Sequence, residues 1–270
     1  MVEYFKLDKI VKVGEEIQLP QDRFYVIRKV GTDAASAACL VIDGVETGLF
    51  VSDIAPLHKT TSNLLGPFDL KDLYYVVPPG KKFWVKGPSG AKVRIIGEIG
   101  RVAPGEPMPA TFASRFENQG KVFRTYVTGS ATLAPAGGTW AADAETEVLV
   151  LTPRTIEKYL FNDVVMASLT GYATAPAEGD VAVRFFLEGV PFDILTKEAG
   201  RLGIDLFSIP KPPAGTTEME AFTLADRPIE VLGDRTFSVR FVNTSGAGIG
   251  TATGVDLVAA VWLICTYSKG

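Results

Sequence analysis

The chain has 270 residues and a formal net charge of −4; 47% of its residues are hydrophobic and 21% are charged. This length accommodates one large β domain or two small ones. Lysine and arginine form no cluster, so we expect no nucleic-acid-binding face. The longest late apolar run, Val255–Cys265, is too short to span a bilayer as a helix, and the first residues have no apolar segment typical of a secretory signal.

The apolar excess allows two interpretations. One is a β-rich core with much alanine and valine, and the other is surface that copies of the chain bury against one another. Asparagine and glutamine together number only seven. Because both deamidate when hot, their scarcity predicts a thermophilic host.

Short runs of β-branched and aromatic residues, separated by glycine and proline, fill the first hundred residues. Asp43-Gly44 is a tight-turn signal, and it predicts a hairpin between the apolar runs on either side of it. Leu73–Val77, Phe83–Val85 and Val93–Ile99 are separated by two turns, so we predict that they are consecutive antiparallel strands. About eight strands in about a hundred residues is the spacing of a compact barrel or sandwich.

The composition changes after residue 102, where three prolines, Pro104, Pro107 and Pro109, deny the backbone the donors that a regular ladder needs. We interpret residues 103–120 as a Pro/Gly-rich connection between a first β-barrel, residues 1–102, and a second, residues 121–270. A long loop within one domain is the alternative, but such loops are uncommon.

The second half again offers about eight strands, together with one or two short helices. Thr152 suits a helix N-cap and Pro153 the first helical position, and Ile156, Tyr159 and Leu160 follow at helical spacing. The segment Pro191–Leu202 can hold one or two further helical turns. The predicted fold class is therefore all-β, with two consecutive antiparallel β-barrel or sandwich units and one or two short helices.

The two halves end alike. Lys82–Lys86 alternates between apolar and polar residues and precedes a long apolar strand, and Thr236–Arg240 does the same in the second half. Such a penultimate strand and the apolar final strand are expected to pair in the middle of a sheet. We predict a duplicated topology, although two β-hairpins can also resemble each other by chance.

Residues that carry chemistry are scarce. The only histidine is His58, and the two cysteines, Cys39 and Cys265, lie in apolar runs where we expect buried free thiols. A disulfide between them would require neighbouring strands, so their pairing stays open. The sequence has too few histidines and cysteines to form a zinc site or a histidine-based catalytic triad. We therefore predict no enzymatic activity, no catalytic or metal-binding residue and no cofactor.

Tryptophans are the candidate contact residues. Trp84 alternates with Phe83 and Val85, so it points away from them and is either exposed or packed at an interface. Trp140 lies in a Gly/Ala-rich loop, whereas the neighbours of Trp262 predict a core position. Trp84 and Trp140 are therefore the predicted interface or ligand contacts, with stacking on a sugar as one possibility.

The segments LYYVVPPGKKFWVK and AKVRIIGEI, with the second closing strand GVDLVAAVWLICTY, carry a resemblance to a known class. The chain resembles the jelly-roll or β-barrel major capsid or spike proteins of tailless icosahedral, membrane-containing phages and archaeal viruses. The resemblance implies barrels standing on a capsid floor, shell contacts through barrel walls and no catalytic residues. The length of this chain does not fit the double jelly-roll subtype, whose chains are usually longer.

The expected function is therefore that of a non-enzymatic structural virion protein, a capsid protein or a capsid-associated spike. It would be made in the host cytoplasm, enter the virion, and bind copies of itself and other virion proteins, without nucleic acid or a membrane span. The alternative is a receptor- or carbohydrate-binding β-sandwich module. A cupin-like enzyme would need several histidine ligands, and the chain has one.

Overall fold

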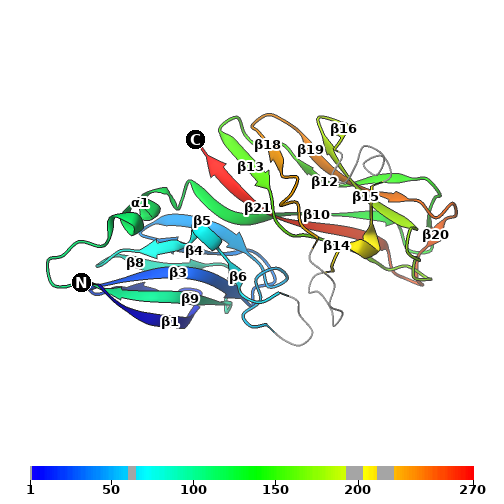
Figure 1. Cartoon of the computed structure of the whole chain (residues 1–270). Helices are drawn as coiled ribbons and strands as arrows, with labels where there is room; N and C mark the ends of the chain where they lie inside the picture. Colours follow the sequence, from blue (N-terminus) through cyan, green and yellow to red (C-terminus); the bar gives the residue numbers. More distant parts are fainter. Residues whose placement is uncertain (1, 60–64, 193–202, 212–221) are drawn as a thin grey trace. The chain divides into compact units, whose positions relative to one another are not determined.

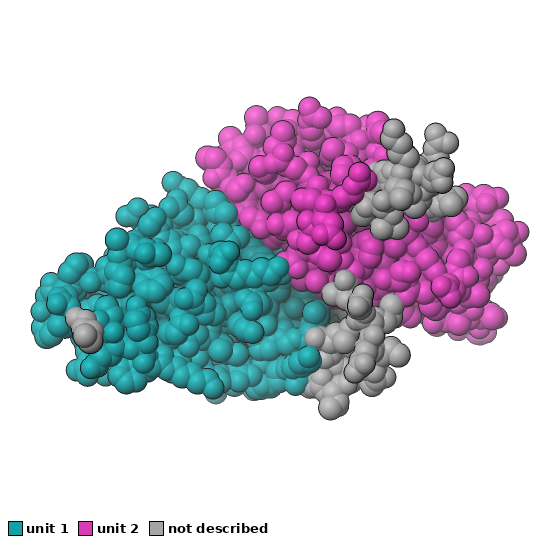
Figure 2. Space-filling model, viewed as in Figure 1, with its two compact units in different colours: residues 1–125, 213–216 teal, residues 126–212, 217–270 magenta. Residues whose placement is uncertain are grey.

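The computed structural model describes residues 2–59, 65–192, 203–211 and 222–270. Antiparallel strands dominate these residues, together with a single α-helix among them, so the predicted all-β class is confirmed (Figure 1). The chain divides into two compact units, which Figure 2 colours separately. Unit 1 comprises residues 1–125 and 213–216, and unit 2 comprises residues 126–212 and 217–270.

Unit 1 is built from short strands joined by tight turns. Its strands are β1 (Glu3–Lys12), β2 (Glu16–Gln18), β3 (Arg23–Thr32), β4 (Ala38–Ile42), β5 (Val45–Phe50), β6 (Phe68–Asp69), β7 (Tyr75–Val77), β8 (Lys82–Lys86) and β9 (Lys92–Arg101). A 3₁₀ turn (Lys71–Leu73) precedes β7, and helix α1 (Ala110–Asn118) follows β9.

The strands of unit 1 form two sheets. One has the order β1-β9-β3, with β6 and β7 both on the far side of β3, and the other has the order β2-β8-β4-β5. The pairs β1·β9, β2·β8, β3·β7 and β4·β5 are nested in the sequence, like one long hairpin folded back on itself. This is the jelly-roll arrangement. The sheets face each other through contacts such as Tyr25 with Phe83, whose ring centroids lie 6.0 Å apart.

Unit 2 begins within β10 and repeats this plan. Its elements are β10 (Val122–Ala134), β11 (Thr139–Trp140), β12 (Glu145–Leu151), β13 (Glu157–Phe161), β14 (Val165–Thr170), β15 (Val181–Leu187), β16 (Val190–Pro191), β17 (Ile204–Asp205), a 3₁₀ turn (Leu206–Ser208), β18 (Ile229–Val231), β19 (Phe237–Asn243), β20 (Ile249–Gly250) and β21 (Leu257–Lys269). The sheets are β10-β21-β13-β18, with β14 also on β21, and β12-β19-β15, with β16 and β17 on β15; β11 and β20 form a separate pair.

The nested order is therefore duplicated. In unit 2 the pairs β10·β21, β11·β20, β12·β19, β13·β18 and β15·β16 again enclose one another in sequence. Phe161 of one sheet stacks on Phe237 of the other with centroids 4.7 Å apart, and Phe185 packs beside them. Burial of a phenylalanine of this kind stabilises the fold by roughly 1.5–3 kcal/mol. Among the described strands of both units the sheets remain open at their edges, so each unit is a sandwich and not the closed barrel that the sequence also allowed.

The tight turn predicted from the sequence is present in the structure, whereas the predicted strand partners are not. The hairpin at Asp43-Gly44 is confirmed: both residues have positive φ, 49° and 83°, as a tight two-residue turn requires. The three runs after Leu73 form the consecutive strands β7, β8 and β9 of antiparallel sheets, as predicted. They do not pair with one another, because β7 and β9 pair with β3 and β8 pairs with β2 and β4. The predicted pairing of the penultimate strand with the final strand of each half is also wrong. All four strands lie inside a sheet, but β8 and β9 belong to different sheets, and so do β19 and β21. The alternation of apolar and polar side chains shows which face of a strand is buried, but it does not show which strand pairs with it.

The helix predictions also need correction. Residues 157–161 form strand β13 and not a helix, because β13 pairs with β21 and β18 and these pairings override the local spacing of apolar residues. The second predicted helix, Pro191–Leu202, falls almost entirely outside the described residues. Helix α1 was not predicted; it lies in the segment 103–120, where Phe112 packs on Phe24 and Tyr74. The division of the chain into folding domains at 1–102, 103–120 and 121–270 stays a prediction.

Candidate assembly surface

Exposed apolar side chains gather at a few places in each unit. In unit 1 they lie on β1 and β5, and in unit 2 most lie at one end of the sandwich. The set is Tyr4, Phe5, Ile10, Val45, Leu49, Val150, Ile156, Val190, Phe207, Leu232 and Val255. Contiguous exposed apolar surface is typical of contacts with another molecule, whereas scattered single residues are ordinary.

Strand β1 is a long edge strand. It pairs with β9 along all ten residues, from Glu3 opposite Arg101 to Lys12 opposite Lys92. Leu7 and Val11 are buried, whereas Tyr4 and Phe5 are each 52% exposed and Ile10 is 45% exposed. Within the described part of the chain, no strand pairs with the other edge of β1. Such an edge presents backbone donors and acceptors to any strand that approaches it.

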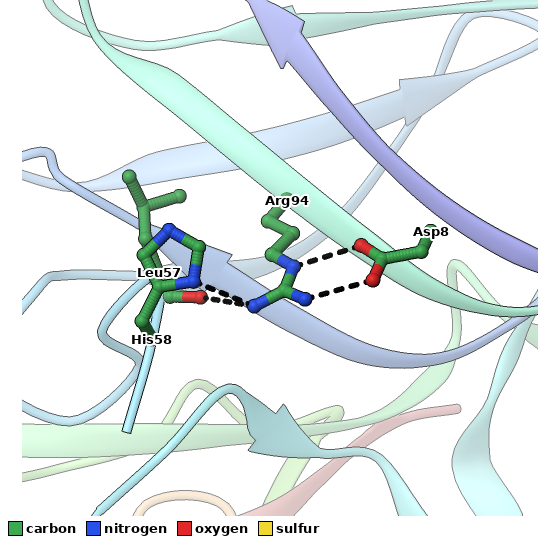
Figure 3. A network of polar contacts seen from close by, with 4 residues as sticks. All are labelled: Asp8, Leu57, His58 and Arg94. Atoms are coloured by element: carbon green, nitrogen blue, oxygen red, sulfur yellow. Dashed lines mark hydrogen bonds and ion pairs between the residues drawn. The ribbon is translucent and has the colours of Figure 1, made fainter. Parts of the chain in front are cut away.

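Arg94 of β9 ties β1 to its sheet (Figure 3). Its guanidinium binds the Asp8 carboxylate in a bidentate manner, with both N–O distances 2.8 Å, and donates to the Leu57 carbonyl oxygen at 3.1 Å. The same guanidinium lies 2.7 Å from Nδ1 of His58. Since arginine has no acceptor, Nδ1 accepts this hydrogen bond. The single histidine is therefore an exposed residue in a structural contact that holds the loop after β5 against the sheet.

The hydrogen bond from Arg94 lowers the pKa of Asp8 below its ordinary value of 3.8, with smaller contributions from nearby positive charge. A carboxylate with a lowered pKa stabilises the fold above the ordinary pKa, and that stabilisation is lost as the pH falls from 3.8 through the folded-state pKa. We expect the Asp8 carboxyl to titrate below pH 3.8 by NMR and closer to 3.8 in Arg94→Gln. Equal midpoints in the two proteins would contradict the ion pair.

One end of unit 2 collects four exposed apolar side chains. Hydrogen bonds from Asp234 N–H to the Pro153 carbonyl (3.0 Å) and from Glu188 N–H to the Thr236 carbonyl (2.8 Å) bring three loops together there. Val150, Ile156, Val190 and Leu232 are carried by these loops or by the strand ends beside them, and we call them the end patch of unit 2. The end patch is a second place where apolar surface lies outside the core.

The tryptophans differ from one another in their environments. Trp84 is half-buried on β8, and the Lys82 ammonium lies 5.8 Å from its ring centroid. Trp140 is 2% exposed, its indole N–H donates to Thr146 Oγ1 at 3.1 Å, and it belongs to the core of unit 2. The burial of Trp140 leaves no open ring face, so we retain only Trp84 as a contact candidate. Trp262 is half-buried on β21, and the core position expected for it is wrong.

Both cysteines are buried free thiols, as expected, Cys39 in unit 1 and Cys265 in unit 2. Burial raises the pKa of Cys39 to about 11, and a thiol that stays protonated is a poor nucleophile. Among the described residues, no group of three or more histidine, cysteine or acidic side chains could hold a metal ion. Within the same residues, no helix is both long and apolar enough to cross a membrane.

A pocket beside β1 contains an ion pair. It includes Glu3, Asp22 and Arg101, and the Asp22 carboxylate binds Arg101 Nε at 3.2 Å. Two of the charges that line it, those of Asp22 and Arg101, therefore neutralise each other.

Two amides that no sequence pattern indicated, Gln119 and Asn243, are fully buried, and each satisfies several backbone groups. Gln119 Oε1 accepts from Val76 N–H at 2.7 Å, and its Nε2 donates to the Val76 carbonyl at 3.1 Å. Asn243 donates to the carbonyls of Trp140, Ala141 and Ala247. The chain has only seven amide side chains, and this rarity was the one feature of the sequence that could have drawn attention to Gln119 and Asn243.

Comparison with known proteins gives architectural likeness only. No family model matches the chain, and no curated protein matches it. Among solved structures, the major capsid protein P2 of bacteriophage PM2 is 12% identical, with 100% of this chain and 98% of that chain covered and a TM-score of 0.33. A chain of the Sulfolobus turreted icosahedral virus is 11% identical, with coverages of 98% and 90% and a TM-score of 0.37.

A peptide-N(4)-(N-acetyl-β-D-glucosaminyl) asparagine amidase is also similar, at 13% identity, with 99% and 96% of the two chains covered and a TM-score of 0.29. The solved structures thus include capsid proteins, the class that the sequence resembles, and an enzyme. Since all three TM-scores lie below 0.5, the function of this chain has to rest on its own residues.

Proposed function

We propose that this chain is a non-enzymatic structural virion protein, a capsid protein or a capsid-associated spike, that assembles through the surfaces of its two β-sandwiches. The observation that carries the proposal is the tandem of two jelly-roll units with apolar side chains exposed on an edge strand and at a sandwich end. Copies of the chain and other virion proteins are its partners, and the virion is its location.

Three considerations support this function over others. Jelly-roll folds occur in viral capsid proteins, in lectins and in cupins. A cupin centre uses several histidine ligands, and the only histidine here, His58, is engaged with Arg94. Exposed apolar side chains such as Tyr4, Phe5 and Leu232 would be a liability for a monomer and are suited to burial in an assembly.

The test is the assembly state of the purified full chain. Light scattering coupled to size-exclusion chromatography, over a hundredfold range of concentration, is expected to give a defined oligomer. Negative-stain microscopy is then expected to show regular particles, rings or sheets. A monodisperse monomer at the highest concentration, with no ordered assembly on the grid, would exclude a shell role.

Trp84 supports a second candidate, a receptor- or carbohydrate-binding module. Its half-exposed ring on the outer side of β8 is of the kind that stacks on a sugar, although the Lys82 ammonium lies near the same ring. Phe83 and Val85 face the core on either side, so the strand holds the ring in a fixed direction.

For this candidate we expect binding on a glycan array, and a reduction of about fivefold to tenfold in affinity in Trp84→Ala, because loss of ring stacking costs about 1–1.5 kcal/mol. The ring is not in the core, so thermal unfolding of the variant should match that of the wild type. The control is Trp140→Phe, which changes a buried ring and should leave glycan binding unaltered. An array with no bound glycan would remove the candidate.

A further inference from the structure

We propose that β1 pairs with β1 of a second copy of the chain, antiparallel and about a two-fold axis at Leu7. The two β1-β9-β3 sheets would then merge into one continuous sheet. This contact specifies part of the self-association proposed above and rests on that proposal.

The backbone of β1 shows which groups face the open edge. Val13 N–H donates to the Ala91 carbonyl at 2.9 Å, on the β9 side, whereas Lys12 N–H donates to the Glu15 carboxylate and the Lys12 carbonyl accepts from Glu15 N–H. Backbone groups alternate in direction along a strand. Tyr4, Lys6, Asp8 and Ile10 therefore direct their N–H and C=O groups away from β9. They form an uninterrupted set of donors and acceptors for an added strand.

Among the registers centred near the middle of β1, which pair most of the strand, charge selects one for two copies. With the axis at Leu7, Lys6 lies opposite Asp8 of the other copy, and Tyr4 lies opposite Ile10. An axis at Lys6 would place that lysine opposite itself, and an axis at Asp8 would place two carboxylates face to face. Like charges directly opposite are destabilising, and opposite charges stabilise a cross-strand pair. An axis between residues would set outward-facing side chains against inward-facing ones, so it does not fit a continuous sheet.

The same register covers the exposed apolar side chains of β1. Tyr4 and Ile10 meet on the outer face, and Phe5 meets Lys9, whose stem and ammonium can lie against an aromatic ring. Leu7 meets its own copy at the axis, as a two-fold contact requires. Lysines on an edge strand usually prevent pairing with other chains. Here Lys6 and Lys9 instead acquire partners, which makes the edge selective for its own copy.

The register can be tested by crosslinking the full chain. Residues 5 and 9 of opposite copies would form a non-hydrogen-bonded pair with Cα atoms about 4.5 Å apart, within reach of a disulfide. Within one copy they are about 13 Å apart along the strand, which is too far. The double variant Phe5→Cys/Lys9→Cys is therefore expected to give a disulfide-linked dimer on oxidation. Its control, Glu3→Cys/Lys9→Cys, would face correctly only with the axis at Lys6 and should remain uncrosslinked.

Charge reversal provides an independent test that needs no crosslink. Lys6→Glu sets a carboxylate opposite Asp8 twice in each pair of copies, and sedimentation equilibrium should show at least a tenfold weaker association. Lys12→Glu is the control, since it reverses a charge on the same strand and face but has Val2 opposite it. Within one copy Lys6 lies opposite Glu98 and Lys12 opposite Lys92, so thermal unfolding of both variants is measured to separate loss of association from loss of stability. Its association should stay within about twofold of the wild type.

The outcomes separate this contact from the broader function. A wild-type chain that remains a monomer overturns both the contact and the proposed self-association. An oligomer that is insensitive to Lys6→Glu and gives no Phe5→Cys/Lys9→Cys dimer overturns the β1 contact and leaves self-association through other surfaces, such as the end patch of unit 2. Equal crosslinking of the two cysteine pairs would overturn the register.

Discussion

Replacement of Asn243 by aspartate is expected to lower the free energy of unfolding of unit 2 by about 3–5 kcal/mol at neutral pH, because it leaves a buried charge without compensation. The Asn243 side chain is fully buried, and its Nδ2 donates to the carbonyls of Trp140, Ala141 and Ala247 at 2.8–3.0 Å. Its Oδ1 accepts from Ser245 N–H and Oγ. A carboxylate at the same place would face three carbonyl oxygens with no proton to donate.

Urea unfolding followed by intrinsic fluorescence measures this loss, since Trp140 lies beside the substituted residue. The deficit should shrink at acid pH, where the new carboxyl becomes protonated and regains one donor. Asn118→Asp is the matched control: it makes the same change at an exposed position, and we expect less than about 0.5 kcal/mol. A similar loss in both variants would show that the buried amide is not what stabilises this corner.

Replacement of Gln119 by methionine is expected to destabilise unit 1 by about 2–6 kcal/mol, since two buried backbone groups lose their partners and each costs about 1–3 kcal/mol. Gln119 follows helix α1, and its amide binds both the N–H and the C=O of Val76. Those groups lie on the side of β7 that faces away from β3. The amide thus closes a sheet edge as a further strand would.

Methionine keeps the volume of the side chain and removes both hydrogen bonds, so the effect isolates the polar contribution. Hydrogen exchange of the Val76 amide should accelerate more than that of amides in β4 or β8, which do not contact Gln119. Unchanged exchange at Val76 would contradict the edge-closing role. Asn118→Ala, at the neighbouring exposed position, provides the control and is expected to change stability by less than about 0.5 kcal/mol.

The sequence predicted the features that depend on neighbouring residues. The turn at Asp43-Gly44 follows from the positive φ that both positions need, and asparagine, aspartate and glycine tolerate that conformation best. The buried side chains of Phe83 and Val85 follow from strand alternation, as does the outward direction of Trp84. The burial of Trp140 could not be predicted in this way, because its strand β11 has only two residues and shows no alternation that indicates a buried face.

The candidate surface was only partly predictable. The apolar excess indicated that the chain has more hydrophobic residues than a core needs, but composition cannot place them. Tyr4 and Phe5 could have faced a second sheet or solvent. Among the strands that the structure describes, β1 pairs with β9 alone, which leaves both side chains on an open edge strand. Arg94 and Asp8 are more than eighty residues apart in the chain, so their ion pair depends on the same pairing.

By itself, the amino-acid sequence determined the all-β class, the local turns and the scarcity of catalytic groups, because backbone preference, side-chain alternation and composition act over a few residues. Only the tertiary structure decided which strands pair, that successive strands cross between sheets, and that residues 157–161 form a strand. Strand pairing joins residues far apart in the chain through backbone groups that every residue shares, so local sequence carries little information about the partner. The same long-range pairing left one edge of β1 open, and the proposed contact between copies depends on that edge.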